Sequence, residues 1–233
     1  RLLLENGIEP VMQISCRDRN KIALQSDILG ANALGIKNIL CITGDSVKAG
    51  DQQSAKAVHE FESVKLLKQI QSFNNGIDPT YELLSDHKTE IFAGAAADPS
   101  YKNLKIVKMR TEQKKEAGAR FIQTQMIMDK KYLIDFCDEI SKPLNLPVLA
   151  GVFLLKSYKN ALFINKFVPG ANIPDQILNR LKESNNPGEE GINIAAEQVK
   201  EFIAISQGVH IMAVKSEHLI PEILKRAEIN LEY

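Results

Sequence analysis

Three short groups of residues in this sequence have side chains that could do chemistry. Gly44-Asp45 places a carboxylate directly after a glycine, Ala97-Asp98-Pro99 holds a second carboxylate, and Thr124-Gln125 joins a hydroxyl to an amide. A glycine lets a ligand approach the backbone, and a carboxylate beside it can stabilise positive charge. Gly-Asp is equally an ordinary turn, so this dipeptide alone does not decide between a site and a turn.

The amides of Gln123 and Gln125 form a further candidate feature, because both lie in one β-like segment. Side chains two residues apart in a strand share a face, so both amides should point the same way. Buried amides need hydrogen-bond partners, which a polar ring-shaped ligand could supply. A hydrogen-bond network within the protein is the alternative.

Six short segments rich in Val, Ile or Phe have the composition of buried parallel strands. We expect these strands at 11–16, 38–43, 90–96, 120–128, 147–153 and 209–214. Between them, apolar residues at helical spacing predict helices at 22–34, 58–70, 104–118, 130–141, 175–182, 192–207 and 216–226, and residues 1–7 resemble the end of another helix. This alternation predicts parallel strands joined by right-handed crossovers.

Two folds are built from such repeats, an open doubly wound sheet and a closed barrel. Neither GxGxxG nor GxxxxGK[ST] follows any expected strand, so the phosphate loop of a doubly wound nucleotide-binding sheet has no support. We therefore predict an α/β protein with a TIM (β/α)8 barrel, in a single domain over residues 1–233. Only six of the eight strands are identified, so the first two are expected to precede Arg1. In this fold the site lies at the carboxyl ends of the strands.

The composition argues against several classes of partner. Twenty-nine basic residues balance 29 acidic ones, so no net field attracts nucleic acid or an anionic membrane. No apolar run approaches the roughly 20 residues of a membrane helix. The three cysteines, Cys16, Cys41 and Cys137, are widely spaced and the four histidines are scattered, which predicts reduced thiols and no metal site. We expect a cytoplasmic protein with a small-molecule ligand.

Longer motifs occur in one order along nearly the whole chain. They are CRDRN at 16–20, ALQSDILGANALGIKNILCITGD at 23–45, ADP at 97–99, KKEAGARFIQTQ at 114–125, PVLAG at 147–151, VPGANIP at 168–174 and GVHIM at 208–212. This combination resembles the methylenetetrahydrofolate reductase family, and most closely the form fused to a homocysteine methyltransferase domain.

The resemblance implies flavin-dependent reduction of 5,10-methylenetetrahydrofolate to 5-methyltetrahydrofolate. In that family, hydride passes from N5 of the reduced flavin to the methylene carbon, after the five-membered ring opens to an iminium cation. Asp45 matches the family aspartate that stabilises this cation and tunes the flavin. Gln125 matches a glutamine that contacts the folate, and Lys114 matches a lysine that pairs with the flavin diphosphate.

Five further positions are assigned to the cofactor by the same resemblance. Thr43 and Gly44 belong to the TGD motif. Gln13 stands where many relatives have histidine beside the flavin, Gly94 where some have tyrosine, and Asp98 where others have histidine or asparagine near the adenosine part. Family habit favours FAD over FMN. Electrons would come from NADH, NADPH or a redox partner subunit.

Arg17, Asp18 and Arg19 lie between an expected strand and an expected helix. We expect them to be structural rather than catalytic, with Asp18 capping the helix and the arginines in salt bridges.

The family's proton-donating glutamate and a flavin-contacting threonine lie on the first two strands, so both are expected upstream of Arg1. The chain by itself could therefore lack activity. Two alternatives stay open, a flavin-free pterin-binding barrel methyltransferase and a non-catalytic subunit that binds folate or a partner protein. A homo-oligomer, formed through the exposed faces of the 58–70 and 192–205 helices, is also open.

Overall fold

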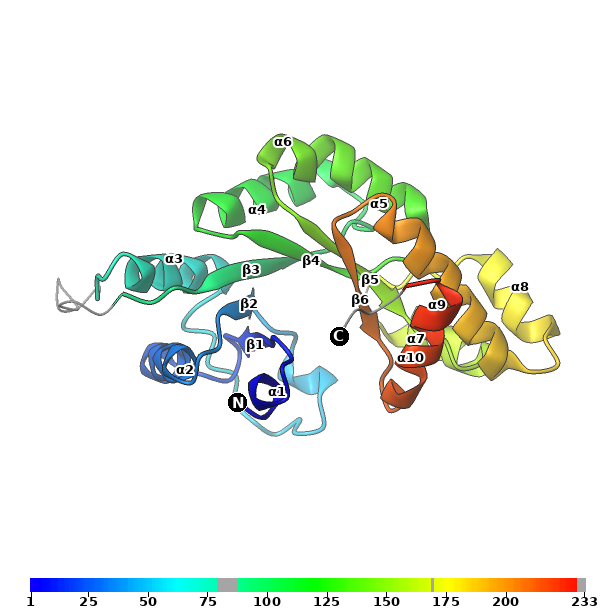
Figure 1. The fold of residues 1–233 in the computed structure, drawn as a ribbon, viewed down its shortest axis with the longest axis horizontal. Coiled ribbons are helices and arrows are strands. Elements are labelled where there is room, and N and C mark those ends of the chain that lie inside the picture. Colours follow the sequence, from blue (N-terminus) through cyan, green and yellow to red (C-terminus); the bar gives the residue numbers. More distant parts are fainter. Residues whose placement is uncertain (79–87, 169, 230–233) are drawn as a thin grey trace. The chain divides into compact units, whose positions relative to one another are not determined.

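The structure is a computed structural model that describes residues 1–78, 88–168 and 170–229. Pro169 of the VPGANIP motif lies outside the described residues. The protein has an α/β fold in which the strands follow one another in sheet order from β1 to β6, with helices between them (Figure 1). The predicted alternation of strands and helices is therefore confirmed, whereas closure into an eight-stranded barrel stays a prediction.

All six expected strands are present within a few residues of their predicted bounds. They are β1 (Val11–Ser15), β2 (Asn38–Ile42), β3 (Phe92–Ala97), β4 (Phe121–Met126), β5 (Val148–Phe153) and β6 (Gly208–Met212). The α-helices are α1 (Leu2–Glu5), α2 (Lys21–Ala33), α3 (Ser63–Asn74), α4 (Leu104–Glu116), α5 (Lys130–Phe136), α6 (Lys142–Leu144), α7 (Tyr158–Phe167), α8 (Asp175–Glu183), α9 (Pro187–Ile203) and α10 (Ile220–Arg226).

Two predicted helices need correction, and one helix was missed. The helix expected at 58–70 begins only at Ser63, because Val58 N–H donates to Arg17 O (2.7 Å) in the preceding loop. The helix expected at 192–207 begins at Pro187, where Asn186 caps it. Helix α7 was not predicted at all, although Ser157 caps its first turn by accepting a hydrogen bond from Asn160 N (3.1 Å).

By its internal contacts the chain forms two compact units. The first comprises Arg1–Ala96 and Met109–Ile122, and the second comprises Ala97–Lys108 and Gln123–Tyr233. Strand β4 begins in the first unit and ends in the second. The prediction of a single domain over residues 1–233 stays a prediction.

The first unit is built on parallel pairing of β1 with β2 and of β2 with β3. Asn20 caps α2 by accepting a hydrogen bond from Ala23 N (2.9 Å), so the expectation that Asp18 caps this helix is wrong. Asp18 instead pairs with Arg17, and Arg19 pairs with Asp27 (2.6 Å), as expected of structural arginines.

The second unit is built on parallel pairing of β5 with β6 and on the long helix α9. Helix α9 contacts β5, β6, α8 and α10. It packs so closely that a Cβ on Gly191 would lie 1.8 Å from Leu155 O. Apolar residues including Met126, Leu155, Ile164, Leu178 and Ile194 form the core beneath it.

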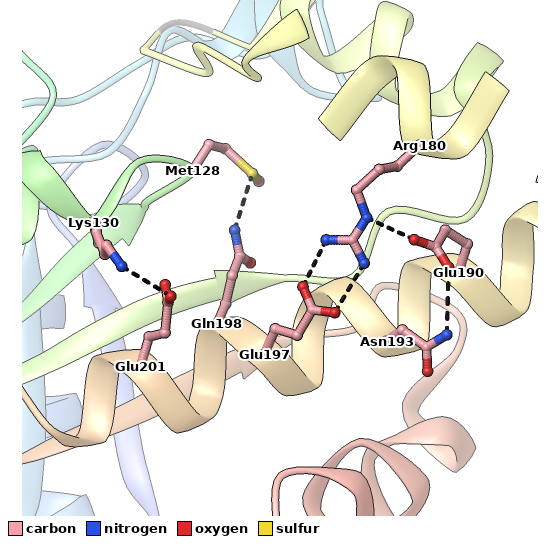
Figure 2. Close-up of polar contacts among 8 residues, drawn as sticks. All are labelled: Met128, Lys130, Arg180, Glu190, Asn193, Glu197, Gln198 and Glu201. Carbon is pink, nitrogen blue, oxygen red and sulfur yellow. Dashed lines mark hydrogen bonds and ion pairs between the residues drawn. The ribbon is translucent and has the colours of Figure 1, made fainter. Parts of the chain in front are cut away.

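The polar face of α9 is joined to neighbouring segments by charged pairs (Figure 2). The Arg180 guanidinium of α8 contacts Glu190 and both carboxylate oxygens of Glu197 at 2.6–2.9 Å. Lys130 at the start of α5 pairs with Glu201 at 3.0 Å. These pairs link α9 to α8 and to the segment that follows β4.

The three cysteines are buried and unpaired, as predicted. Burial raises the pKa of Cys16 and of Cys137 to about 11 and raises the pKa of Cys41 still further. In the described part of the chain, no helix is long and apolar enough to cross a membrane. No three or more His, Cys, Asp or Glu side chains gather as a metal site among these residues.

Candidate active site

Gly44 follows β2 in a conformation that only glycine adopts without strain. Its φ is +92°, and a Cβ there would lie 2.3 Å from Ser15 Oγ and 2.7 Å from Arg17 Cβ. The glycine therefore lets the chain turn against the end of β1. Asp45 follows at once with an exposed side chain, and Arg17 Nη1 donates to its backbone oxygen at 3.4 Å. The turn presents the carboxylate to solvent while its backbone is held.

Thr43 links the end of β2 to the first turn of α3. Its Oγ1 accepts a hydrogen bond from Ser63 N (3.2 Å) and donates to Ser63 Oγ (3.3 Å). The first N–H groups of a helix have no partner within the helix, so this hydroxyl satisfies one of them. The position of Thr43 is thus tied to the start of α3.

Gln13 and Gly94 lie on neighbouring strands of the first unit. Gln13 is exposed on β1, opposite Leu40 of β2. Gly94 is buried on β3, where a Cβ would meet the Phe121 ring at 2.2 Å. The Phe121 ring also stacks on Phe92, with centroids 5.7 Å apart. Gly94 therefore makes room for a ring from β4, and its role toward a cofactor stays a prediction.

The Lys114 side chain runs from the last turn of α4 to the end of β3. Its Nζ donates to Ala96 O at 2.6 Å. A residue near the carboxyl end of a helix in a βα repeat would normally lie far from the strand ends that carry the site. The length of the lysine side chain removes this difficulty. Burial, and next the charge of Arg110, lower the pKa of Lys114.

A cavity of about 590 Å³ lies between α3 and α4 within the first unit. It is lined by Thr43, Glu62, Ser63, Val64, Lys68, Arg110, Gln113, Lys114 and Glu116. Three of these side chains are basic and two are acidic, so the lining has one excess positive charge. The cavity therefore brings Thr43 and Lys114, two of the predicted cofactor residues, to one place.

Two basic residues of this lining were not predicted. Arg110 precedes Lys114 by four residues on α4, and residues at this spacing share one helix face. This spacing could have revealed Arg110 once Lys114 was chosen. Lys68 lies on α3, and no local pattern relates it to Lys114.

Asp98 lies in the second unit and organises the loop after β3. Its Oδ1 accepts hydrogen bonds from Ser100 N (3.0 Å) and Ser100 Oγ (2.6 Å). A Cβ on Gly170 would lie 2.7 Å from Asp98 Oδ2, so the loop that contains Gly170 comes close to the carboxylate. These contacts give Asp98 a structural role, and its predicted contact with a cofactor stays a prediction.

Gln125 lies near the end of β4, also in the second unit. Its side-chain amide bonds to the backbone of the next residue on the same strand. Oε1 accepts a hydrogen bond from Met126 N at 3.0 Å. Within the part of the chain that the structure describes, Nε2 donates to no protein group. The amide nitrogen is therefore available to a ligand.

The fold and these residues define a class of protein. It is an α/β protein of successive βα units, with polar side chains at the carboxyl ends of its strands and a cavity partly lined by basic residues. The chain belongs to the methylenetetrahydrofolate reductase family, because the family model described as "Methylenetetrahydrofolate reductase" matches residues 1–228. The family predicted from the motifs is confirmed, and the fused form stays a prediction.

Similar proteins are longer than this chain. Methylenetetrahydrofolate reductase 1 of Schizosaccharomyces pombe is 22% identical over 225 residues, which cover 94% of this chain and 36% of that protein. Probable methylenetetrahydrofolate reductase (NADPH) of Caenorhabditis elegans is 24% identical over 234 residues, which cover 94% of this chain and 32% of that protein. The chain thus spans about a third of the length of these relatives.

One solved structure covers 97% of both chains with a TM-score of 0.47 and 14% identity. It is an uncharacterized protein from Clostridium thermocellum, described as binding two copies of 5-methyl-5,6,7,8-tetrahydrofolic acid.

Proposed function

We propose that the protein reduces 5,10-methylenetetrahydrofolate to 5-methyltetrahydrofolate with a bound flavin, in a TIM barrel. Membership of the family supports the reaction class. The observation that carries the proposal is the α3/α4 cavity, in which Lys114 reaches the end of β3 beside Thr43. These two residues are among those that the family motifs assign to the cofactor.

The residues of the cavity fit the diphosphate of a flavin dinucleotide. A lysine ammonium attracts phosphate as a point charge, and Lys68 and Arg110 add positive charge in the same lining. The volume of about 590 Å³ falls within the range of small-molecule sites. The choice of FAD over FMN follows the habit of the family. A bound reduced flavin would supply the hydride.

Asp45 would act on the substrate through its charge. The carboxylate is exposed at the turn after β2, and its backbone is held by Arg17. A fixed negative charge near a substrate that becomes an iminium cation stabilises the transition state more than the ground state. Gly44 lets the chain turn closely against Ser15 and Arg17, which fixes where the carboxylate of Asp45 begins.

Gln125 would orient the folate. Its Nε2 is available as a donor while Oε1 is engaged by Met126 N, so the amide can offer a hydrogen bond to an acceptor on the pterin edge. Electrons would come from a nicotinamide nucleotide, in keeping with the NADPH in the name of the Caenorhabditis elegans relative. Roles of Gln13, Gly94 and Asp98 toward the flavin, a cytoplasmic location and a homo-oligomer stay predictions.

The cofactor site is tested by Lys114→Ala in the full-length protein, with Lys115→Ala as the control. Both substitutions remove one positive charge from the same helix turn, but Lys115 does not line the cavity. We expect Lys114→Ala to weaken FAD binding about 10- to 100-fold, the weight of one charge-assisted hydrogen bond, as measured by flavin fluorescence quenching. Equal effects of the two substitutions would contradict the placement of the diphosphate.

The reaction is tested by anaerobic half-reactions of the full-length protein. The flavin is first reduced, and 5,10-methylenetetrahydrofolate is then added while flavin absorbance is recorded. Reoxidation with formation of 5-methyltetrahydrofolate is the expected result. Absence of any flavin binding together with methyl transfer would favour the pterin-binding methyltransferase. Flavin and folate binding without reoxidation would favour a non-catalytic subunit.

A further inference from the structure

The end of β4 that carries Gln125 is connected to β5 by a hydrogen bond of the Thr124 side chain. Gly151 N on β5 donates to Thr124 Oγ1 at 2.9 Å, and the same hydroxyl donates to Gln125 O at 2.7 Å. Ile127 N then donates to Gly151 O at 2.9 Å. Gly151 thus bonds to Thr124 Oγ1 before Gln125 and to Ile127 N after it, while Gln125 O accepts from the Thr124 hydroxyl of its own strand.

A histidine on the next strand adds a third bond at the same place. His210 of β6 pairs in register with Gly151 of β5. Its imidazole passes over Gly151, and Nε2 lies 2.8 Å from Thr124 O on β4. A carbonyl oxygen can only accept, so Nε2 carries the hydrogen and donates it.

The absence of a side chain at Gly151 makes this contact across two strands possible. A Cβ there would lie 3.0 Å from His210 Nε2 and 2.6 Å from Gln125 O. Neither backbone nor imidazole could keep its position beside such a Cβ. The imidazole itself is half-buried, and burial lowers the pKa of His210, which favours the neutral ring.

The bonds at this point control the direction of the Gln125 amide. Oε1 of Gln125 is tied to Met126 N, so the side chain follows the backbone of residues 124–126. Any rotation of the peptide between Thr124 and Gln125 therefore redirects Nε2. The donor on that peptide's carbonyl is His210.

We propose that His210 is a positioning residue for substrate binding, which fixes the Thr124–Gln125 peptide and thereby aims the Gln125 amide at the folate ring. This role rests on the proposed function, in which Gln125 contacts the folate. His210 acts through Gln125 and touches neither substrate nor cofactor.

The test uses the full-length, flavin-loaded protein and three substitutions on β6. His210→Phe keeps a ring of similar size but removes the donor, and His210→Gln restores a nitrogen that can donate to Thr124 O. Ile211→Val is the control for a small loss of volume on the same strand. The readouts are the dissociation constant for 5-methyltetrahydrofolate by calorimetry and the rate of flavin reduction.

We expect His210→Phe to weaken folate binding about tenfold, the weight of one neutral hydrogen bond, while flavin content and flavin reduction stay at wild-type values. His210→Gln should recover part of this loss, and Ile211→Val should cause none. Wild-type folate affinity in His210→Phe, or equal losses of folate and flavin binding, would overturn the proposal.

A double-mutant cycle with Gln125→Ala separates positioning from a general structural effect. If His210 acts through Gln125, His210→Phe adds no further loss of folate affinity to Gln125→Ala. Additive losses would overturn the proposal. Failure of the proposed function has a different signature, because the reduced flavin of the wild-type protein would then not be reoxidised by 5,10-methylenetetrahydrofolate, whatever the protein's affinity for folate. Absence of 5-methyltetrahydrofolate binding by the wild-type protein would overturn the role of His210 itself.

Discussion

The two units of this protein hold their strand ends in different ways. In the first unit, a glycine turn leaves Asp45 exposed, and basic side chains line a cavity between two helices. In the second unit, side chains at the strand ends bond to neighbouring strands, as His210 does to Thr124, and carboxylates on α9 pair with Arg180 and Lys130. Several polar groups in the first unit therefore lie at an exposed turn or along a cavity, whereas many in the second connect neighbouring elements of the fold.

The largest effect that this comparison predicts is a loss of stability from Gly191→Ala in the second unit. The new Cβ would start 1.8 Å from Leu155 O, a backbone atom that cannot move aside cheaply. We expect the free energy of unfolding to fall by about 3 kcal/mol or more, because overpacking against backbone displaces a whole helix. Urea unfolding measures the change.

Gly188→Ala is the matched control for this substitution. Gly188 lies in the same helix, and the atom nearest to a Cβ added there is Asn186 Oδ1, at 3.7 Å. Its stability should stay within about 0.5 kcal/mol of the wild type or rise slightly. A small loss of stability in Gly191→Ala would contradict the close packing of α9 against Leu155 after β5.

Asp45→Asn in the intact enzyme should show the opposite behaviour, a loss of activity without a loss of stability. The side chain is exposed, so loss of its charge should change the stability of the fold little. Folate reduction should slow by about 100-fold, as when one electrostatic group is removed from a transition state, while flavin reduction changes far less. Stopped-flow measurements of both half-reactions check this.

Asp51→Asn provides the control, since Asp51 is an exposed carboxylate in the same loop. It should leave both half-reactions unchanged. If Asp45→Asn slowed both half-reactions equally, the carboxylate would not have the specific role toward the folate that is proposed for it.

Gly44→Ala should affect both properties, because this glycine shapes the turn that carries Asp45. A left-handed φ and two close neighbours make alanine strained, at a cost of about 1–3 kcal/mol. Gly30→Ala in α2 meets nothing within 4 Å and should instead stabilise the protein by about 0.5–1 kcal/mol. Thermal unfolding of the two variants gives the contrast, and similar shifts would argue against strain at residue 44.

The smallest effects concern the charged pairs of α9. Arg180 contacts two carboxylates and is one-third exposed, whereas Lys130 and Glu201 are about half exposed. We expect Arg180→Ala to cost about 1 kcal/mol and Lys130→Ala less than about 0.5 kcal/mol. Urea unfolding at low and high salt measures both. A larger cost at Lys130 would reverse the order that exposure predicts.

Much of the fold follows from the sequence because buried parallel strands are short apolar runs that local composition reveals. Helix α7 escaped this pattern because Leu162, Phe163 and Phe167 are apolar yet exposed, which blurs the contrast between its two faces. The start of α9 was placed too late because its first turn is polar. The Asn186-Pro187 signal of a helix start was the better guide.

The position of a candidate residue was predictable where the residue follows its own strand directly, as Gly44 and Asp45 follow β2. It was less predictable where a side chain reaches across elements. His210 crosses Gly151 to contact Thr124, and no spacing along the chain encodes that contact. Lys68 joins Lys114 at the cavity only because α3 and α4 are neighbours in space.

The reach of Lys114 from α4 to Ala96 O sets a limit on the connection between α4 and β4. An α-helix turns about 100° per residue. Inserting or deleting one residue between Lys114 and Phe121 would therefore move the Lys114 ammonium away from the end of β3 or shift the register of β4. The length of this short connector is thus under a constraint that its own sequence does not display, and a one-residue insertion there should disturb the cavity that Lys114 lines more than most changes of residue type would.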